Sequence, residues 1–161
     1  MTDLSTFEAV RSTKLAAELN DDQCRVLAEL VTLRDLKQGE MLAQEGTVDN
    51  HLYVIVRGTV GVMKNTGTAN EVTVNTLSPG DFVGELGFMD GTELSASKVA
   101  LGDARVLGLE REKLESLLTT HPVIVYRVMR AIIRVVHQIQ RRLSMQQAEL
   151  SNYIYKQHGR Y

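Results

Sequence analysis

The spacing of apolar side chains changes twice along the chain and divides it into three parts. Up to about residue 34, apolar positions recur at helical intervals behind a capping cluster at residues 20–22, so we expect helices there. From Gly39 to Leu109, short β-rich runs alternate with glycine-containing turns, which is typical of strands. These runs are residues 41–43, 52–56, 59–63, 71–77 and 96–109. Many short strands with frequent turns predict a small barrel or jelly roll.

Helical spacing returns after Leu109, first over residues 111–118 and then in a long run from His121-Pro122 towards Leu150. An apolar stripe on the long helix alternates steps of four and three residues, as a coiled-coil seam requires. The stripe consists of Val125, Met129, Ile132, Val136, Ile139 and Leu143, and a second apolar flank consists of Val128, Ile133 and Val135. We therefore expect one face to dock on the strands while the other forms a homodimer. The alternative is that the whole stripe packs on the chain's own strands.

The order of helices, β-roll and long helix predicts an α+β fold in one compact domain, which 161 residues suffice to form. Residues 1–122 are expected to hold the N-terminal helices and the β-roll. Residues 123–161 are expected to hold the long helix and a tyrosine-rich tail, as part of the same domain. An ordered cap and a frayed end both remain open for that tail.

Composition and charge narrow the class of protein. A net charge of -2 supplies no basic field for nucleic acid, so we expect no direct DNA binding. The single cysteine, Cys24, cannot form an internal disulfide, and the first residues lack a signal-peptide pattern, so we expect a cytoplasmic protein. Arg127, Arg130 and Arg134 interrupt the most apolar stretch, and we therefore expect no membrane span.

The sequence lacks the usual motifs of catalysis. Metal enzymes on a small β-roll need clustered histidine and carboxylate ligands, but the histidines are scattered and form no His-x-His pair. They are His51, His121, His137 and His158. A nucleophile elbow and a Walker loop are also missing from the sequence. We therefore predict that the chain is no enzyme and uses no metal or cofactor.

The informative motif is Phe-Val-Gly-Glu-Leu-Gly at residues 82–87, after a Pro-Gly-Asp turn. It resembles the phosphate-binding cassette of cyclic-nucleotide-binding domains of the catabolite-activator type, which reads Phe-x-Gly-Glu-Leu-(Ala/Gly) and then Arg-(Ser/Ala)-Ala. The resemblance covers about residues 20–150, including Gly39, Gly46 and the hairpin at residues 52–58, in the family's order. It implies a cyclic-nucleotide-binding-type β-roll, a double-stranded β-helix or jelly roll, with N-terminal helices and a long C-terminal dimerisation helix.

By this resemblance, the cassette is a short helix after a glycine turn, and its free backbone N–H groups face a cyclic phosphate. Gly84, Leu86 and Gly87 would form that frame. Glu85 would accept a hydrogen bond from the ribose 2′-hydroxyl. The alternative is that these residues only shape and cap a turn.

One position departs from the family pattern. Leu94 stands where the family has the arginine that neutralises the phosphate, and a charged hydrogen bond of that kind contributes roughly 1.5–3 kcal/mol. Ser95 keeps a hydroxyl at the family's next position. Strand alternation puts Lys98 on the face of Leu94 unless a bulge intervenes, so Lys98 is either a replacement cation or an ordinary solvated lysine.

In the family, polar residues of the long helix contact the base, and Gln146 and Gln147 fall at the matching place. Both also suit an ordinary helix surface, to which we assign Arg141 and Arg142.

Two functional hypotheses follow. The first is a homodimeric sensor whose ligand is cyclic AMP, cyclic GMP or another nucleotide and shifts the hinge near His121-Pro122, acting through the dimer or a protein effector. The second is a degenerate domain that binds no nucleotide and serves as a dimeric protein-interaction scaffold. Leu94 favours the second hypothesis, and Glu85 in its intact frame favours the first.

Overall fold

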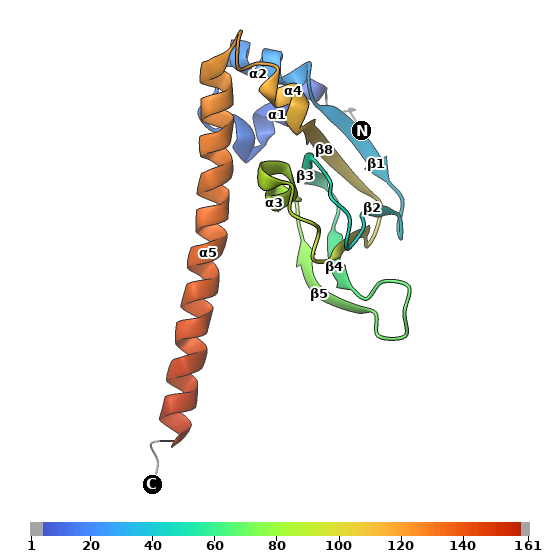
Figure 1. The fold of residues 1–161 in the computed structure, drawn as a ribbon, viewed down its shortest axis with the longest axis vertical. Helices are drawn as coiled ribbons and strands as arrows, with labels where there is room; N and C mark the ends of the chain where they lie inside the picture. Colours follow the sequence, from blue (N-terminus) through green and yellow to red (C-terminus); the bar gives the residue numbers. More distant parts are fainter. Residues whose placement is uncertain (1–4, 159–161) are drawn as a thin grey trace.

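A computed structural model describes residues 5–158, which form a β-roll with helices at one end and along one side (Figure 1). The helices are α1 (Thr6–Ser12), the 3-10 helix η1 (Lys14–Ala16), α2 (Asp21–Ala28), α3 (Glu85–Asp90), α4 (Arg111–Glu115) and α5 (Pro122–His158). The strands are β1 (Thr32–Leu36), β2 (Met41–Ala43), β3 (His51–Arg57), β4 (Val60–Lys64), β5 (Val72–Leu77), β6 (Phe82–Val83), β7 (Ser97–Ala100) and β8 (Ala104–Glu110).

Two antiparallel four-stranded sheets make up the roll, one with the order β1-β8-β3-β6 and the other with the order β2-β7-β4-β5. β3 and β8 lie at the centre of the first sheet and bury most of their side chains, whereas β5, at an edge of the second, is exposed along nearly all its length. The predicted α+β jelly roll with flanking helices is thus confirmed.

Two strand assignments differ from the sequence prediction. Residues 32–36 form β1 instead of continuing the N-terminal helix, because each residue pairs with one in β8, from Thr32 with Gly108 to Leu36 with Ala104. The expected single run at residues 96–109 is two strands in different sheets, since a bend at residues 101–103 separates β7 from β8. The hairpin expected at residues 52–58 is also not formed, because β3 and β4 belong to different sheets and pair with other strands. These differences arise from pairing with distant strands, which local propensity does not report.

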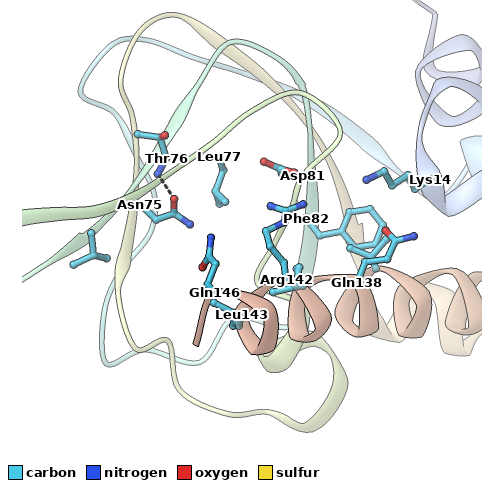
Figure 2. Close-up of a pocket in the computed structure, with 13 residues that line it drawn as sticks. Lys14, Asn75, Thr76, Leu77, Asp81, Phe82, Gln138, Arg142, Leu143 and Gln146 are labelled. Atoms are coloured by element: carbon cyan, nitrogen blue, oxygen red, sulfur yellow. Dashed lines mark hydrogen bonds between the residues drawn. The ribbon is translucent and has the colours of Figure 1, made fainter. Parts of the chain in front are cut away.

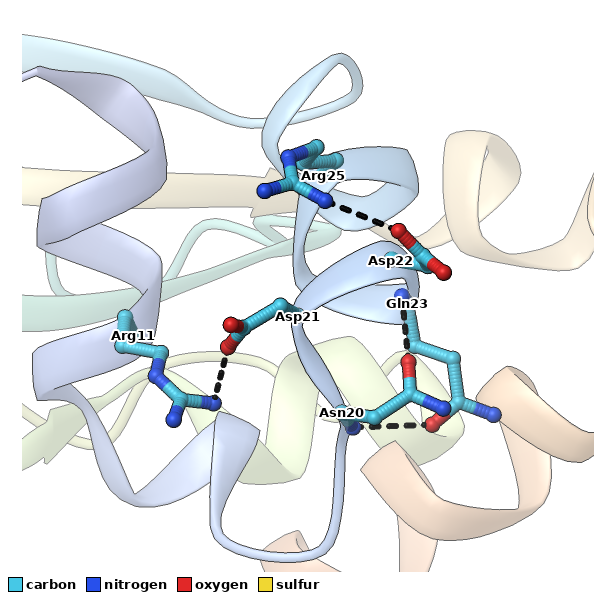
Figure 3. A network of polar contacts seen from close by, with 6 residues as sticks. All are labelled: Arg11, Asn20, Asp21, Asp22, Gln23 and Arg25. Carbon is cyan, nitrogen blue, oxygen red and sulfur yellow. Dashed lines mark hydrogen bonds and ion pairs between the residues drawn. The ribbon is translucent and has the colours of Figure 1, made fainter.

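The predicted cap of the second helix is confirmed in detail. Asn20 and Gln23 form a capping box: the Gln23 backbone N–H donates to Asn20 Oδ1 at 2.9 Å, and the Asn20 N–H donates to Gln23 Oε1 at 3.0 Å (Figure 3). Arg127 of α5 donates to the same Gln23 oxygen at 2.9 Å and to the Glu18 carbonyl at 3.2 Å. The cap of α2 is therefore also an anchor for α5.

A second polar contact joins α5 to the N-terminal helices. The carboxylate of Glu18 lies 3.3 Å from both Arg130 and Arg134, one arginine at each oxygen. The contact with Arg130 is an ion pair without hydrogen-bond alignment. The arginines that interrupt the apolar stretch of α5 thus hold the helix against its own domain. Within residues 5–158, no helix is apolar enough over sufficient length to cross a membrane.

The expected dimer seam needs correction in its first half. Val125 and Ile132 are buried in the main core of the single chain, and Ile132 is only 1% exposed. Met129 and Val136 are partly buried and pack against the same core. The N-terminal helices and the roll cover this end of the stripe. α5 has 37 residues and is about 55 Å long, so its second half extends well beyond the roll.

The apolar residues that α5 leaves exposed are shifted around the helix. Ile133 is 59% exposed, and Leu143 and Leu150 are each 60% exposed. With the partly buried Val136, these three residues recur at the steps of three, seven and seven that a coiled-coil seam allows. We call this strip of Ile133, Val136, Leu143 and Leu150 the outer seam. The tyrosine-rich tail continues α5 to His158, and residues 159–161 lie outside the described part of the chain.

Candidate ligand-binding site

The glycine-framed motif at residues 84–91 forms the expected short helix after a glycine turn. Gly84 adopts the left-handed conformation at φ 81° and caps the start of α3, and Gly91 does the same at φ 73° at its end. Within the turn, the Phe88 N–H donates to the Gly84 carbonyl at 3.0 Å. The backbone N–H groups at the start of α3 therefore lie where the helix itself supplies no acceptors.

The cassette helix rests directly on the start of β3. A Cβ atom added to Gly87 would lie 2.7 Å from the Asp49 carbonyl oxygen, and one added to Gly84 would lie 3.0 Å from the His51 carbonyl oxygen. Asp49 is itself held in place, because its carboxylate accepts hydrogen bonds from the His51 N–H at 2.9 Å and from the Tyr53 hydroxyl at 3.3 Å. Burial, together with the Asp49 carboxylate, raises the pKa of Tyr53 to about 12, so this hydroxyl stays a donor.

Gly87→Ala should therefore destabilise the domain by about 1–3 kcal/mol, because the new methyl group overlaps a fixed carbonyl oxygen. Thermal unfolding measures this loss. Gly102→Ala is the matched control, since a Cβ atom at Gly102 would meet no atom within 4 Å. Equal unfolding temperatures for the two variants would show that α3 does not need its close approach to β3.

A cavity of about 300 Å³ opens beside α3, and we call it the cassette cavity. Six of the eight predicted site residues line it: Gly84, Glu85, Leu86, Gly87, Leu94 and Ser95. Its other walls come from β4, β5, β6, β7 and α5, and the last of these contributes Ile139. One space is thus enclosed by residues 84–87, by residues 94–95 about ten positions later, and by α5, which is far along the chain.

Leu94 and Lys98 both face this space. Leu94 is buried, at 8% exposure, and its backbone is fixed by hydrogen bonds with Thr47 O at 2.9 Å and with Gly46 N at 2.8 Å. Lys98 is partly buried and donates to the Ala96 carbonyl at 3.2 Å. Burial lowers the pKa of Lys98, and the nearby Glu85 carboxylate opposes that shift. Leu94 precedes β7 and lies outside any strand, so the expected strand alternation does not relate the two residues, but the fold still brings the Lys98 cation to the cavity that Leu94 lines.

A second cavity, of about 440 Å³, lies between β5 and α5, and we call it the helix cavity (Figure 2). The two cavities adjoin, because Asn75, Leu77, Phe82 and Ile139 line both. Gln146 lines the helix cavity, as expected for a residue near the base, whereas Gln147 lines neither cavity within one chain. The structure therefore brings seven of the eight predicted residues to one bipartite site.

The two cavities differ in charge. Two carboxylates, Glu85 and Glu93, and one cation, Lys98, line the cassette cavity. In the helix cavity, two cations, Lys14 and Arg142, accompany one carboxylate, Asp81. Sequence reasoning assigned Arg142 to a solvated face and gave Lys14 no role. No local signal marks either residue, since the cavity exists only because η1, β5 and α5 meet in space.

Residues 33–121 match the family described as Cyclic nucleotide-binding domain. This match covers more than half of the chain, which therefore belongs to that family. Its glycine-framed cassette beside a jelly-roll cavity agrees with this membership.

Two curated relatives and one solved structure illustrate the family. The chain is 30% identical over 97 residues to the Cyclic AMP receptor protein of Thermus thermophilus, covering 60% of this chain and 45% of that protein. It is 31% identical over 112 residues to the cAMP-activated global transcriptional regulator of Salmonella typhimurium, covering 69% and 50%. The chain thus spans about half the length of these relatives. A cyclic nucleotide-binding domain from Methylobacillus flagellatus shares the fold, with a TM-score of 0.76, 23% identity, and coverage of 84% and 79%.

Proposed function

We propose that the chain is a regulatory sensor module that binds a cyclic nucleotide in the cassette cavity. The observation that carries this proposal is the convergence of Gly84, Glu85, Ser95 and Lys98 on one cavity of a size suited to a small ligand. The relatives named above are regulators whose names refer to cyclic AMP, which supports the same class of ligand. Cyclic AMP, cyclic GMP and related nucleotides are the candidates.

In the proposed pose, the phosphate lies at the start of α3, where backbone N–H groups and Lys98 face it. Lys98 takes over the charge that the family's arginine provides. Glu85 accepts the ribose hydroxyl, and the base extends along α5 towards Gln146. Gln147 lies at the edge of the outer seam, from which it would reach the site of a second copy.

We further propose a homodimer through the outer seam of α5. Ile133, Leu143 and Leu150 expose apolar surface along a helix that its own roll covers only in part. Because Ile139 lines both cavities, a ligand that contacts it would shift α5 about the bend before Pro122 and change how two copies, or a protein effector, meet.

The setting that fits this role is the cytoplasm, because the lone Cys24 is fully buried and forms no disulfide. We propose no direct contact of this chain with DNA, on its net charge of -2.

Lys98→Met tests the pose, because methionine keeps most of the side-chain volume and removes the charge. The affinity for cyclic AMP or cyclic GMP, measured by isothermal titration calorimetry, should fall by about ten-fold or more. Lys64→Met, an exposed lysine on β4 that lines neither cavity, is the control and should bind like the wild type. Equal affinities for Lys98→Met and Lys64→Met would contradict the proposal that Lys98 binds the phosphate.

The second candidate function is a scaffold that binds no nucleotide. The buried leucine at the arginine position, in a cavity with more carboxylates than cations, favours this alternative. The same titration separates the two functions. If titration of the folded wild-type chain with millimolar cyclic AMP or cyclic GMP shows no binding, the sensor hypothesis is wrong and the scaffold hypothesis is favoured.

A further inference from the structure

The helix cavity contains cations that the single phosphate of a cyclic mononucleotide, placed in the cassette cavity, does not use. Lys14 comes from η1 and Arg142 from α5, more than one hundred residues apart in the sequence. Figure 2 shows Arg142 extending from α5 into the space below Asp81, with Lys14 beyond Phe82 on the far side. The fold therefore brings two positive side chains to the wall of one cavity.

Neither cation is neutralised by the protein. Among residues 5–158, the Arg142 guanidinium and the Lys14 ammonium form no hydrogen bond and no ion pair. Arg130 and Arg134, on the same helix, are instead paired with Glu18. The Asp81 carboxylate is engaged by the backbone, since it accepts from the Ser78 N–H at 2.8 Å. The helix cavity thus presents an unused guanidinium fork, whose geometry suits a phosphate group.

The two cavities adjoin, and each has a cation in its wall. Leu77, Phe82 and Ile139 line both cavities, whereas Lys98 lines only the cassette cavity and Arg142 only the helix cavity. Each cavity alone, at about 300 and 440 Å³, falls within the range of roughly 300–1,000 Å³ that small ligands occupy. A mononucleotide whose base reaches Gln146 enters the helix cavity, but its single phosphate lies in the cassette cavity and leaves Arg142 and Lys14 without an anion.

We propose that the preferred ligand is a dinucleotide with two separated phosphate groups, one at α3 and Lys98 and the other at Arg142 and Lys14. This inference rests on the proposed function, because the first phosphate occupies the same cassette. It also accounts for Leu94. Binding free energy shared between two phosphates makes a second cation at the cassette unnecessary, and the leucine side chain instead packs on the ribose and base.

Isothermal titration of the full chain with cyclic di-GMP and cyclic di-AMP, beside cyclic AMP and cyclic GMP, tests this proposal. At least one dinucleotide should bind about ten-fold or more tightly than either mononucleotide. Arg142→Gln should lower the ratio of dinucleotide to mononucleotide affinity by about ten-fold. Arg141→Gln removes the neighbouring arginine, which lines neither cavity, and should leave that ratio as in the wild type.

The outcomes separate this inference from the proposed function. If mononucleotides bind and neither dinucleotide binds more tightly, or if Arg142→Gln and Arg141→Gln give the same affinity ratio, the two-phosphate ligand is wrong and the cyclic-nucleotide sensor stands. If no nucleotide of either kind binds the folded chain, the sensor itself fails, and the dinucleotide proposal fails with it. Circular dichroism of each variant establishes that it is folded.

Discussion

Leu94→Arg should raise the affinity of the chain for a cyclic mononucleotide by about ten- to one-hundred-fold, which corresponds to roughly 1.5–3 kcal/mol. The side chain at this position lines the cassette cavity beside Ser95 and opposite the start of α3. An arginine there adds a planar fork that binds two phosphate oxygens, whereas Lys98 supplies a single ammonium. Isothermal titration calorimetry measures the gain directly.

Three further variants define the origin of that gain. Leu94→Lys should recover less than Leu94→Arg, because an ammonium lacks the paired donors. Leu94→Met conserves volume and should gain nothing. Adding Glu85→Ala to Leu94→Arg should remove much of the improvement, since the ribose contact is lost while the phosphate contact remains. If folded Leu94→Arg shows no binding at millimolar nucleotide, the cassette cavity is closed to nucleotides and the sensor hypothesis should be dropped.

Ile132→Asp should unfold most of the domain, and Ile133→Asp should not, although the two residues are neighbours on α5. Ile132 is 1% exposed in the main core, so an aspartate there buries an unpaired charge and costs at least about 4 kcal/mol. Ile133 is 59% exposed, and its replacement should change the stability of the monomer by only about 0.5 kcal/mol. Chemical denaturation followed by circular dichroism at low concentration compares the two variants.

Light scattering of the same pair tests the outer seam. A wild-type dimer should dissociate on Ile133→Asp, because the charge enters the apolar strip between two copies of α5. Wild-type chain that is monomeric at micromolar concentration, or folded Ile133→Asp that remains dimeric, would contradict the outer seam. A stable, folded Ile132→Asp would instead contradict the packing of α5 on its own core.

Local signals predicted most of the cassette correctly. The resemblance of residues 82–87 to the family cassette implied a short helix after a glycine turn, and α3 begins and ends at glycines with positive φ. The Asn20 cap was predicted equally well. These features depend on backbone freedom and on hydrogen bonds within three or four residues, which the sequence shows directly.

Features that depend on distant partners were predicted less well. β1 was assigned to a helix because its pairing with β8 joins residues about seventy positions apart. The same limit applied to the stripe on α5: its period was visible, but the sequence could not show that the roll and the N-terminal helices bury Ile132.

The sequence by itself thus determined the jelly-roll class from short strands and frequent turns, and its resemblance to the family pattern located the cassette and the leucine at position 94 where the family has an arginine. Tertiary structure alone decided which side chains surround the cavities. The sequence left open whether Lys98 is a replacement cation or an ordinary solvated lysine, and the structure places it on β7 in the wall of the cassette cavity. Arg142 gained its place only because η1, β5 and α5 pack together. The physical reason is that cavity walls are made by segments remote in the chain, whose packing is set by burial of the whole core.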